Sequence, residues 1–447
     1  MRQPASILLV LAAAALLPCS APRSAAQAVG AHSAAATPAQ FDAWRAQIRK
    51  ALYIPDPLPP LATKNCGAFS PAPGVIAERV AYATLFGMRV PAIVYSPQHS
   101  STRRLPALII VNGHGGDKYS WYSFYSGILY ARAGGVVLTY DPIGEGERND
   151  QHMSGTREHD RQIDGPHSGQ RMGGQMITDV MQAVTYLRQR PDVDPARIAV
   201  AGYSMGSFVS ALTGALDIRI HAVVLSGGGD LDGNGGYWDS SSKLMCQARP
   251  YQALSVLGDK GAVLYALNQR RGPTFIINGT ADTLVDIPHH LEPWFQQLRE
   301  RVEAITGTKR NIFDTYFIPN VSHRPNWVTL PAALWLQQTL NFPNWNAKEI
   351  AALPETHISE WAAKNRVDMD RGYIQEDREG GVMALRDDVP NVPRSELNVL
   401  TAAKWEQQKA NFVYQYWVEH ALAADGLTGA AAEAAIVKKP PQTKKPQ

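Results

Sequence analysis

The stretch Arg197-Ile-Ala-Val-Ala-Gly-Tyr-Ser-Met-Gly206 decides the fold of this chain. An apolar run of strand type leads into Ser204, and a helical pattern begins directly after it. A serine flanked by glycines in the order G-x-S-x-G, between a buried strand and a helix, stands on a sharp and strained turn. Gly202 and Gly206 keep Cβ atoms away from the helix and the neighbouring strand. The pattern predicts a nucleophilic Ser204 at the edge of a sheet.

Strand-like and helical patterns alternate on both sides of this turn. Several strand-like stretches are continuous apolar runs, which is typical of strands buried on both faces. Two hairpin-like strands followed by βα units predict an α/β fold, a doubly wound, mostly parallel sheet of about eight strands covered by helices. We expect strands at 78–85, 89–97, 106–112, 134–140, 197–203, 220–226, 273–278 and 313–319, and helices at 121–133, 174–190, 205–216, 288–305 and 328–341.

A serine hydroxyl is a poor nucleophile unless a base and an orienting acid assist it. Of the twelve histidines, His323 follows a late predicted strand and would take the proton from Ser204. Asp282 comes three residues after a glycine turn that ends another predicted strand, and it would fix the tautomer of His323. Asp286 is the competing acid, although at the start of a helical stretch it could simply cap the helix. We predict the catalytic set Ser204, Asp282 and His323.

The negative oxygen that develops during acyl transfer needs two backbone donors. One is the amide of Met205, directly after the nucleophile. The other is expected in the glycine-rich loop that ends the strand at 106–112, where the backbone can approach a substrate closely. We favour Gly116 over Gly115 as this donor and regard His114 as a buttress of the loop.

Two long excursions leave the carboxyl ends of strands, at 142–173 and 227–272. Open α/β sheets place their ligand crevices at these ends, so both excursions are expected to line the substrate side. The first carries His152, His159, Asp160, Asp164 and His167, whose spacing fits no common metal-ligand pattern. A polar, solvated loop without a metal is the favoured interpretation.

These motifs together resemble those of the α/β-hydrolase superfamily. The resemblance covers roughly residues 76–342 and is carried by GHGG at 113–116, GYSMG at 202–206, GTAD at 279–282 and the final SH at 322–323. The proline-rich segment before the sheet, the Tyr140–Arg148 turn and the long interruptions resemble the acetyl-xylan-esterase-like group of secreted serine hydrolases. This resemblance implies deacetylation or a related ester cleavage on carbohydrate-linked esters. An acyl-enzyme mechanism of this kind needs no metal or organic cofactor.

Two other functions compete with an ester hydrolase. A serine peptidase of the prolyl-oligopeptidase type shares the catalytic domain but usually carries an N-terminal propeller, for which about fifty residues before the first strand are too few. A non-catalytic binding protein on the same fold is the third possibility. Such proteins typically lack one member of the catalytic set, and none is missing here.

The N-terminus is typical of a secretory signal peptide. A basic residue, Arg2, precedes an apolar run at 7–17, and Ala26-Gln-Ala28 offers a small-residue cleavage site. The run is too short to span a bilayer. We therefore expect cleavage after Ala28, a secreted or periplasmic location, and no membrane partner afterwards.

The remaining chain divides by composition. Trp361, Trp405 and Trp417 are expected to dock a C-terminal helical segment onto the catalytic domain. We predict a signal peptide at 1–28, an N-terminal helix and Pro-rich segment at 29–75, the catalytic domain at 76–346, a helical extension at 347–424 and a disordered Lys/Pro tail at 425–447.

Charge and cysteine content exclude other classes. A formal net charge of +3 over 447 residues gives no support for nucleic-acid binding. Three cysteines are too few for a disulfide framework. After export Cys66 and Cys246 could form one disulfide or remain two buried thiols, and the sequence leaves both alternatives open. It also leaves the oligomeric state open.

Overall fold

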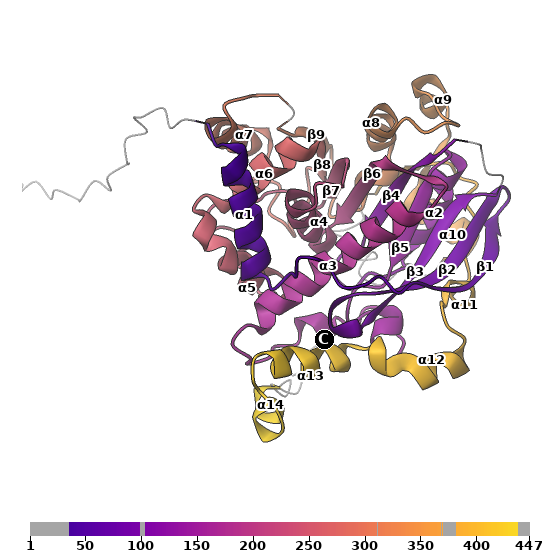
Figure 1. The fold of residues 1–447 in the computed structure, drawn as a ribbon. Helices are drawn as coiled ribbons and strands as arrows, with labels where there is room; N and C mark the ends of the chain where they lie inside the picture. The colour runs from indigo at the N-terminus through magenta and orange to yellow at the C-terminus, as the bar shows by residue number, and fades with distance from the viewer. Residues whose placement is uncertain (1–34, 99–102, 311, 368, 370–380, 437–447) are drawn as a thin grey trace, which may run out of the picture. The chain divides into compact units, whose positions relative to one another are not determined.

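The computed structural model describes residues 35–98, 103–310, 312–367, 369 and 381–436. Its centre is one nine-stranded sheet in the order β1-β2-β3-β5-β4-β6-β7-β8-β9 (Figure 1). In this spatial order, neighbouring strands pair antiparallel from β1 through β3 to β5. They pair parallel from β5 through β4 and on to β9. The strands are β1 (Lys64–Ala72), β2 (Val75–Ala83), β3 (Arg89–Pro97), β4 (Leu105–Val111), β5 (Val136–Tyr140), β6 (Val193–Tyr203), β7 (Ala222–Ser226), β8 (Thr274–Gly279) and β9 (Asp314–Ile318).

This sheet confirms the predicted doubly wound, mostly parallel α/β architecture. Each of the eight predicted strands has its counterpart, from β2 to β9. The sequence missed β1, which lies in the stretch assigned to the Pro-rich segment. Its residues are mostly polar or small and mostly exposed, as an edge strand allows, so it carries no buried apolar run to signal a strand.

Helices cover both faces of the sheet. Along β4, Ala107 and Ile109 pack into one core, and Leu108 and Ile110 pack into the other, as the two-residue period of a strand requires. α3 (Ser168–Gln189) crosses the face of the sheet that belongs to the first core, the core that contains Ala107 and Ile109 (Figure 1). The first core also receives α1 (Pro38–Ala51), α3 (Ser168–Gln189), α4 (Met205–Leu216), α6 (Lys260–Arg271) and α7 (Glu292–Thr306), whereas the second receives α2 (Trp121–Arg132) and α8 (Leu330–Leu340).

The chain after α8 forms short helices and one small two-stranded antiparallel sheet that pack against these cores. The three tryptophans expected to dock this segment are all buried, which confirms that expectation. Trp361 meets the ring of Tyr125 at 4.9 Å and donates from Nε1 to the carbonyl of Val389 at 2.7 Å. The elements are α9 (Ala347–Ala351), β10 (Glu355–His357), α10 (Ile358–Asn365), β11 (Met383–Leu385), α11 (Arg394–Leu397), α12 (Ala402–Gln408), α13 (Tyr414–Ala424) and α14 (Ala430–Ala435).

A buried ionic cluster joins this C-terminal segment to the sheet. The Lys118 ammonium lies 2.5 Å from Asp141 and 2.9 Å from Glu147, and none of the three side chains is exposed. The Glu147 carboxylate also accepts the backbone amides of Val399 and Leu400, at 2.9 and 3.0 Å. The loop after β5 and residues 399–400 are therefore held by the same carboxylate.

The end of the chain differs from the predicted tail. α14 lies inside the stretch expected to be disordered, and Ile436 pairs with Ile163 in an isolated bridge. The run Ala-Ala-Ala-Glu-Ala-Ala has high helix propensity, which favours this last turn. The predicted signal peptide and residues 437–447 lie outside the described residues. Within the described part, no helix combines the length and the apolar character needed to cross a membrane.

Trp361 tests how firmly the C-terminal segment is bound to the second core. Trp361→Ala should lower the free energy of unfolding by about 3–5 kcal/mol, because it removes a fully buried indole and leaves a cavity. Urea unfolding followed by circular dichroism measures this loss. Ile218→Ala, at a side chain that is 69% exposed, is the control and should change stability by less than about 0.5 kcal/mol. Equal effects of the two substitutions would contradict the docking.

Candidate active site

Ser204 stands on the turn between β6 and α4. Its backbone has φ 56° and ψ −119°, a strained combination for a residue with a side chain. A Cβ at Gly202 would come within 2.1 Å of the Gly206 carbonyl oxygen, and a Cβ at Gly206 within 2.1 Å of the Val111 carbonyl oxygen. Both glycines are therefore needed for the strand, the turn and the helix to pack at this distance.

The predicted acid and base meet beyond the ends of β8 and β9. Nδ1 of His323 lies 2.8 Å from Oδ2 of Asp282, which is completely buried. The second carboxylate oxygen of Asp282 accepts the amide of Leu284 at 3.2 Å. With the ionised carboxylate as acceptor, Nδ1 carries the proton and Nε2 is left as a base.

Asp286, the competing acid, takes a different partner. Its carboxylate lies 2.5 Å from Nδ1 of His289, a histidine that is largely exposed. The structure thus brings Asp282 to His323 and leaves Asp286 on an exposed pair. The sequence favoured Asp282, although both aspartates follow the same strand four residues apart.

The position of His323 depends on a glycine that the sequence did not single out. Gly227 follows β7 with φ +61°, and a Cβ there would lie 2.8 Å from Cε1 of His323. The ring of Tyr203 also lies 4.8 Å from the imidazole, and its hydroxyl donates to the His323 carbonyl at 3.0 Å. Contacts with Gly227 and Tyr203 therefore define the position of the imidazole.

A cavity of about 770 Å³ opens beside this set of residues. Ser204 and His323 both line it, so a substrate in the cavity can reach both side chains. Both long excursions contribute to its wall, as expected from their place at the strand ends. From the first comes Arg157, and from the second come Gly235, Gly236, Tyr237, Trp238, Ser240, Ser241, Ser242, Lys243 and Gln247.

A second cavity of about 790 Å³ lies next to the first. The two share His114, Arg157 and Tyr203 in their walls. The glycine-rich loop at 113–116, called the glycine loop below, lines the second cavity. Arg366 and residues 391–394 of the C-terminal segment line it as well. The C-terminal segment therefore forms part of the wall beside the candidate site.

The glycine loop contains both candidates for the second backbone donor, Gly116 and Gly115. The amide of Gly116 donates to the Gly113 carbonyl at 2.9 Å and closes a turn. A substrate oxygen would have to share that proton. Gly115, the alternative donor, has φ +85° and lines the second cavity. This geometry favours Gly115 as the donor, whereas the sequence favoured Gly116.

Buried carboxylates fold the excursion after β5 back on itself. Glu145 accepts the amides of Thr156 and Arg157 at 3.1 and 2.9 Å. Burial raises the pKa of the Glu145 carboxyl well above its usual value. Asp117, which follows the glycine loop, accepts from the Ser154 hydroxyl at 2.5 Å. These contacts place Arg157 in the wall of both cavities.

The polar loop cluster is not one solvated group, as the sequence suggested. His152 stacks on Trp405 at 4.9 Å, and His167 lies 3.2 Å from Asp425. His159 is fully buried and, with Asp160, meets residues from two other segments, which spacing within one loop could not reveal. Cys66 and Cys246 are both free thiols and form no disulfide.

Comparisons with known proteins identify the family of this chain. A sequence model described as the prolyl oligopeptidase family matches residues 120–348, just over half of the chain. The chain belongs to the prolyl oligopeptidase family. With the fold described above, this family membership places the chain in the α/β-hydrolase superfamily.

The methylesterase BT1017 shares this fold, with a TM-score of 0.53 and 20% identity over 86% of this chain and 74% of that one. The thiohydrolase apmlB of Arthrinium phaeospermum is 26% identical over 156 residues, 33% of this chain and 42% of its own. The putative hydrolase YtaP of Bacillus subtilis is 44% identical over 57 residues, 13% of this chain and 19% of its own. The chain thus spans less than half the length of these two curated relatives.

Asp117 should make stability depend on pH. Burial, and then the nearby Asp141 carboxylate, raise the pKa of Asp117 from 3.8 to about 6. Between these values the unfolded chain ionises Asp117 while the folded protein keeps it protonated, so the free energy of unfolding falls as pH rises from about 4 to 6. Asp117→Asn should remove this fall, on the order of 2 kcal/mol.

Urea unfolding at several pH values measures the effect. Asp42→Asn is the control, because the Asp42 side chain is 79% exposed, and it should leave the pH dependence as in the wild type. The same slope in the wild type and in Asp117→Asn would show that Asp117 ionises normally.

Proposed function

We propose that this chain is a secreted or periplasmic carboxylic-ester hydrolase that cleaves carbohydrate-linked esters through an acyl-enzyme on Ser204. The observation that carries the proposal is the 2.8 Å contact between His323 and Asp282 in the wall of the cavity that Ser204 also lines. A strained serine, an imidazole with a free Nε2 and a buried carboxylate are the groups that acyl transfer requires.

The reaction would proceed in two balanced steps. The Ser204 oxygen attacks the ester carbonyl while Nε2 of His323 takes its proton, and the imidazolium then protonates the departing alcohol. A water, deprotonated by the same imidazole, releases the acid and restores Ser204. Asp282 stabilises the imidazolium, and the amide of Met205 with one from the glycine loop, Gly116 or Gly115, stabilises the negative oxygen.

The cavity lining supports a hydroxyl-rich substrate. Ser240, Ser241, Ser242 and Gln247 offer donors and acceptors that suit the hydroxyl groups of a sugar. Nine of the described strands lie in one sheet and two others pair in a small two-stranded sheet, so the described strands form no propeller.

A serine peptidase is the second candidate function. The family match itself favours it, because the family takes its description from oligopeptidases. The same Ser204, His323 and Asp282 would cleave an amide, with His323 protonating an amine in place of an alcohol. Specificity then depends on the cavity walls.

Ser204 should be essential for turnover. Ser204→Ala is expected to lower kcat for a short-chain p-nitrophenyl ester on the order of 10⁴-fold or more, since no other group forms the acyl-enzyme. Ser207→Ala is the matched control. It removes a buried hydroxyl without a hydrogen-bond partner in the described structure, three residues further along, and should keep its activity. Undiminished turnover in Ser204→Ala would contradict the acyl-enzyme mechanism.

The substrate class is tested on the wild-type protein. Initial rates are compared for acetylated xylan, feruloyl esters, methyl uronates and aminoacyl nitroanilides at equal concentration. The proposal predicts that the carbohydrate esters give the higher kcat/KM. Faster cleavage of the anilides would establish the peptidase instead.

Gly227 tests the placement of His323. Gly227→Ala should lower kcat by about 100-fold, because the new Cβ pushes the imidazole from its position. Gly74→Ala is matched in backbone strain, with φ +76°, but nothing lies within 4 Å of its Cβ. Both variants should remain folded by circular dichroism, and only Gly227→Ala should lose turnover. Equal turnover of the two would mean that His323 does not act from this position.

A further inference from the structure

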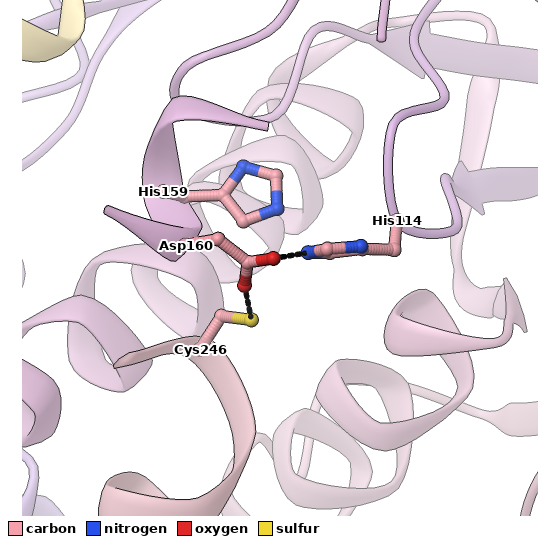
Figure 2. Close-up of side chains that lie close together, drawn as sticks. All are labelled: His114, His159, Asp160 and Cys246. Carbon is pink, nitrogen blue, oxygen red and sulfur yellow. Dashed lines mark hydrogen bonds and ion pairs between the residues drawn. The ribbon is translucent and has the colours of Figure 1, made fainter. Parts of the chain in front are cut away.

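Four potential metal ligands converge beside the candidate active site. They come from three segments far apart in the sequence: His114 from the glycine loop after β4, His159 and Asp160 from the helical turn η3 (Glu158–Asp160), and Cys246 from the turn η4 (Leu244–Ala248). One donor atom of each lies within 4.8 Å of the other three (Figure 2). His114 also lines both cavities.

His159 is aimed into this group with an unused nitrogen. Its Nδ1 lies 2.9 Å from the Ile143 carbonyl oxygen, so Nδ1 carries the proton. Its Nε2 is buried and has no hydrogen-bond partner among the described residues. Figure 2 shows this nitrogen facing Asp160 and His114. A buried acceptor without a partner is costly, and a metal ion would satisfy it.

The other donors are already close together. Nε2 of His114 lies 2.9 Å from Oδ2 of Asp160, and Sγ of Cys246 lies 3.1 Å from Oδ1 of the same carboxylate. Donors around a tetrahedral zinc ion lie about 3–4 Å apart, given bond lengths of about 2.0–2.3 Å. Contacts of this size, and a largest separation of 4.8 Å, need only small side-chain movements.

Their protonation states also suit a cation. Burial lowers the pKa of His159 to about 3 and lowers that of His114, so both imidazoles are neutral ligands. Although burial opposes its charge, the contact with His114 holds the pKa of Asp160 below its usual value. Burial raises the pKa of the Cys246 thiol, and a metal would have to displace that proton.

We propose that His114, His159, Asp160 and Cys246 bind one zinc-class divalent ion in a closed tetrahedral site. Two imidazoles, one carboxylate and one thiolate are a donor set that zinc accepts, whereas calcium and magnesium take oxygen ligands. With four protein ligands the ion has no open position, so its role is structural. It ties the glycine loop to both excursions and makes no bond to the ester during cleavage.

One neighbouring cation competes for this position. The Lys243 ammonium lies 3.2 Å from Oδ2 of Asp160, and its side chain is 39% exposed. Asp160, Lys243 and the Cys246 thiol could form a hydrogen-bonded clasp without a metal. That alternative leaves Nε2 of His159 without a partner. Because Lys243 reaches solvent, it can also turn away when an ion binds.

The test uses Co²⁺ as a spectroscopic probe. The full chain is stripped with a chelator, kept reduced and titrated with Co²⁺. One equivalent should produce the strong visible bands of a tetrahedral ion together with a thiolate-to-cobalt charge-transfer band. Cys246→Ser should lose the charge-transfer band and bind more than about 100-fold more weakly, beyond the cost of losing an outer partner. Cys66→Ser, at the other free thiol, is the matched control and should keep both.

Three further measurements bear on the proposal. Lys243→Gln should bind Co²⁺ more tightly, because it removes a competing charge, and it does not disturb the buried core. Zn²⁺ should raise the melting temperature of the wild type but not of Cys246→Ser, and the circular dichroism of Cys246→Ser should show that the variant is folded. Loss of binding in His159→Gln would further support the ligand set.

Defined results would overturn the site. These are a weak octahedral spectrum without a thiolate band in the wild type, a thiolate band that persists in Cys246→Ser, or an affinity unchanged in Lys243→Gln. None of these readouts uses ester turnover. The metal site and the proposed esterase activity therefore succeed or fail separately.

Discussion

The buried ammonium of Lys118 is the interaction on which the surroundings of the site depend. Burial opposes its charge, but Asp141 and then Glu147 raise the pKa of Lys118 well above its usual value and keep it protonated. Removing either carboxylate would leave a charge buried without a full partner, which costs several kcal/mol. Lys118 follows the glycine loop by two residues, Asp141 follows β5, and Glu147 binds the amides of Val399 and Leu400. Three distant segments are thus fixed at one point.

This arrangement explains why the C-terminal segment belongs to the functional unit. The Glu147 carboxylate is shared between Lys118 and the amides of the C-terminal segment, so the glycine loop and the second cavity wall are positioned together. A buried ion pair adds little net stability compared with apolar packing, but it selects one arrangement among many. The buried apolar surfaces of Trp361 and Trp405 then stabilise the C-terminal segment in the position that the ion pair selects.

The parallel strands could be predicted because their apolar runs are local. The places of Ser204, Asp282 and His323 after β6, β8 and β9 could be predicted because the carboxyl ends of parallel strands meet at one edge of the sheet. The antiparallel edge strand β1 could not, since its exposed residues carry no such run. The partners of Lys118 and the approach of Cys246 to His159 could not either. Both are contacts between segments far apart in the sequence, and no periodicity records them. Gly227 was missed for the same reason, because only the fold brings it against His323.

The two clusters act on opposite sides of the same loop. On the C-terminal side of the glycine loop, Lys118 is held by Asp141. Near the start of the loop, His114 is held by Asp160. The donors expected for the negative oxygen, Gly116 or Gly115, lie between these two anchors. Since the Gly116 amide already closes a turn, the orientation of the Gly115 amide depends on how tightly His114 is held. A loop anchored at both ends loses little freedom when the substrate binds, which is the condition for stabilising a transition state with fixed dipoles.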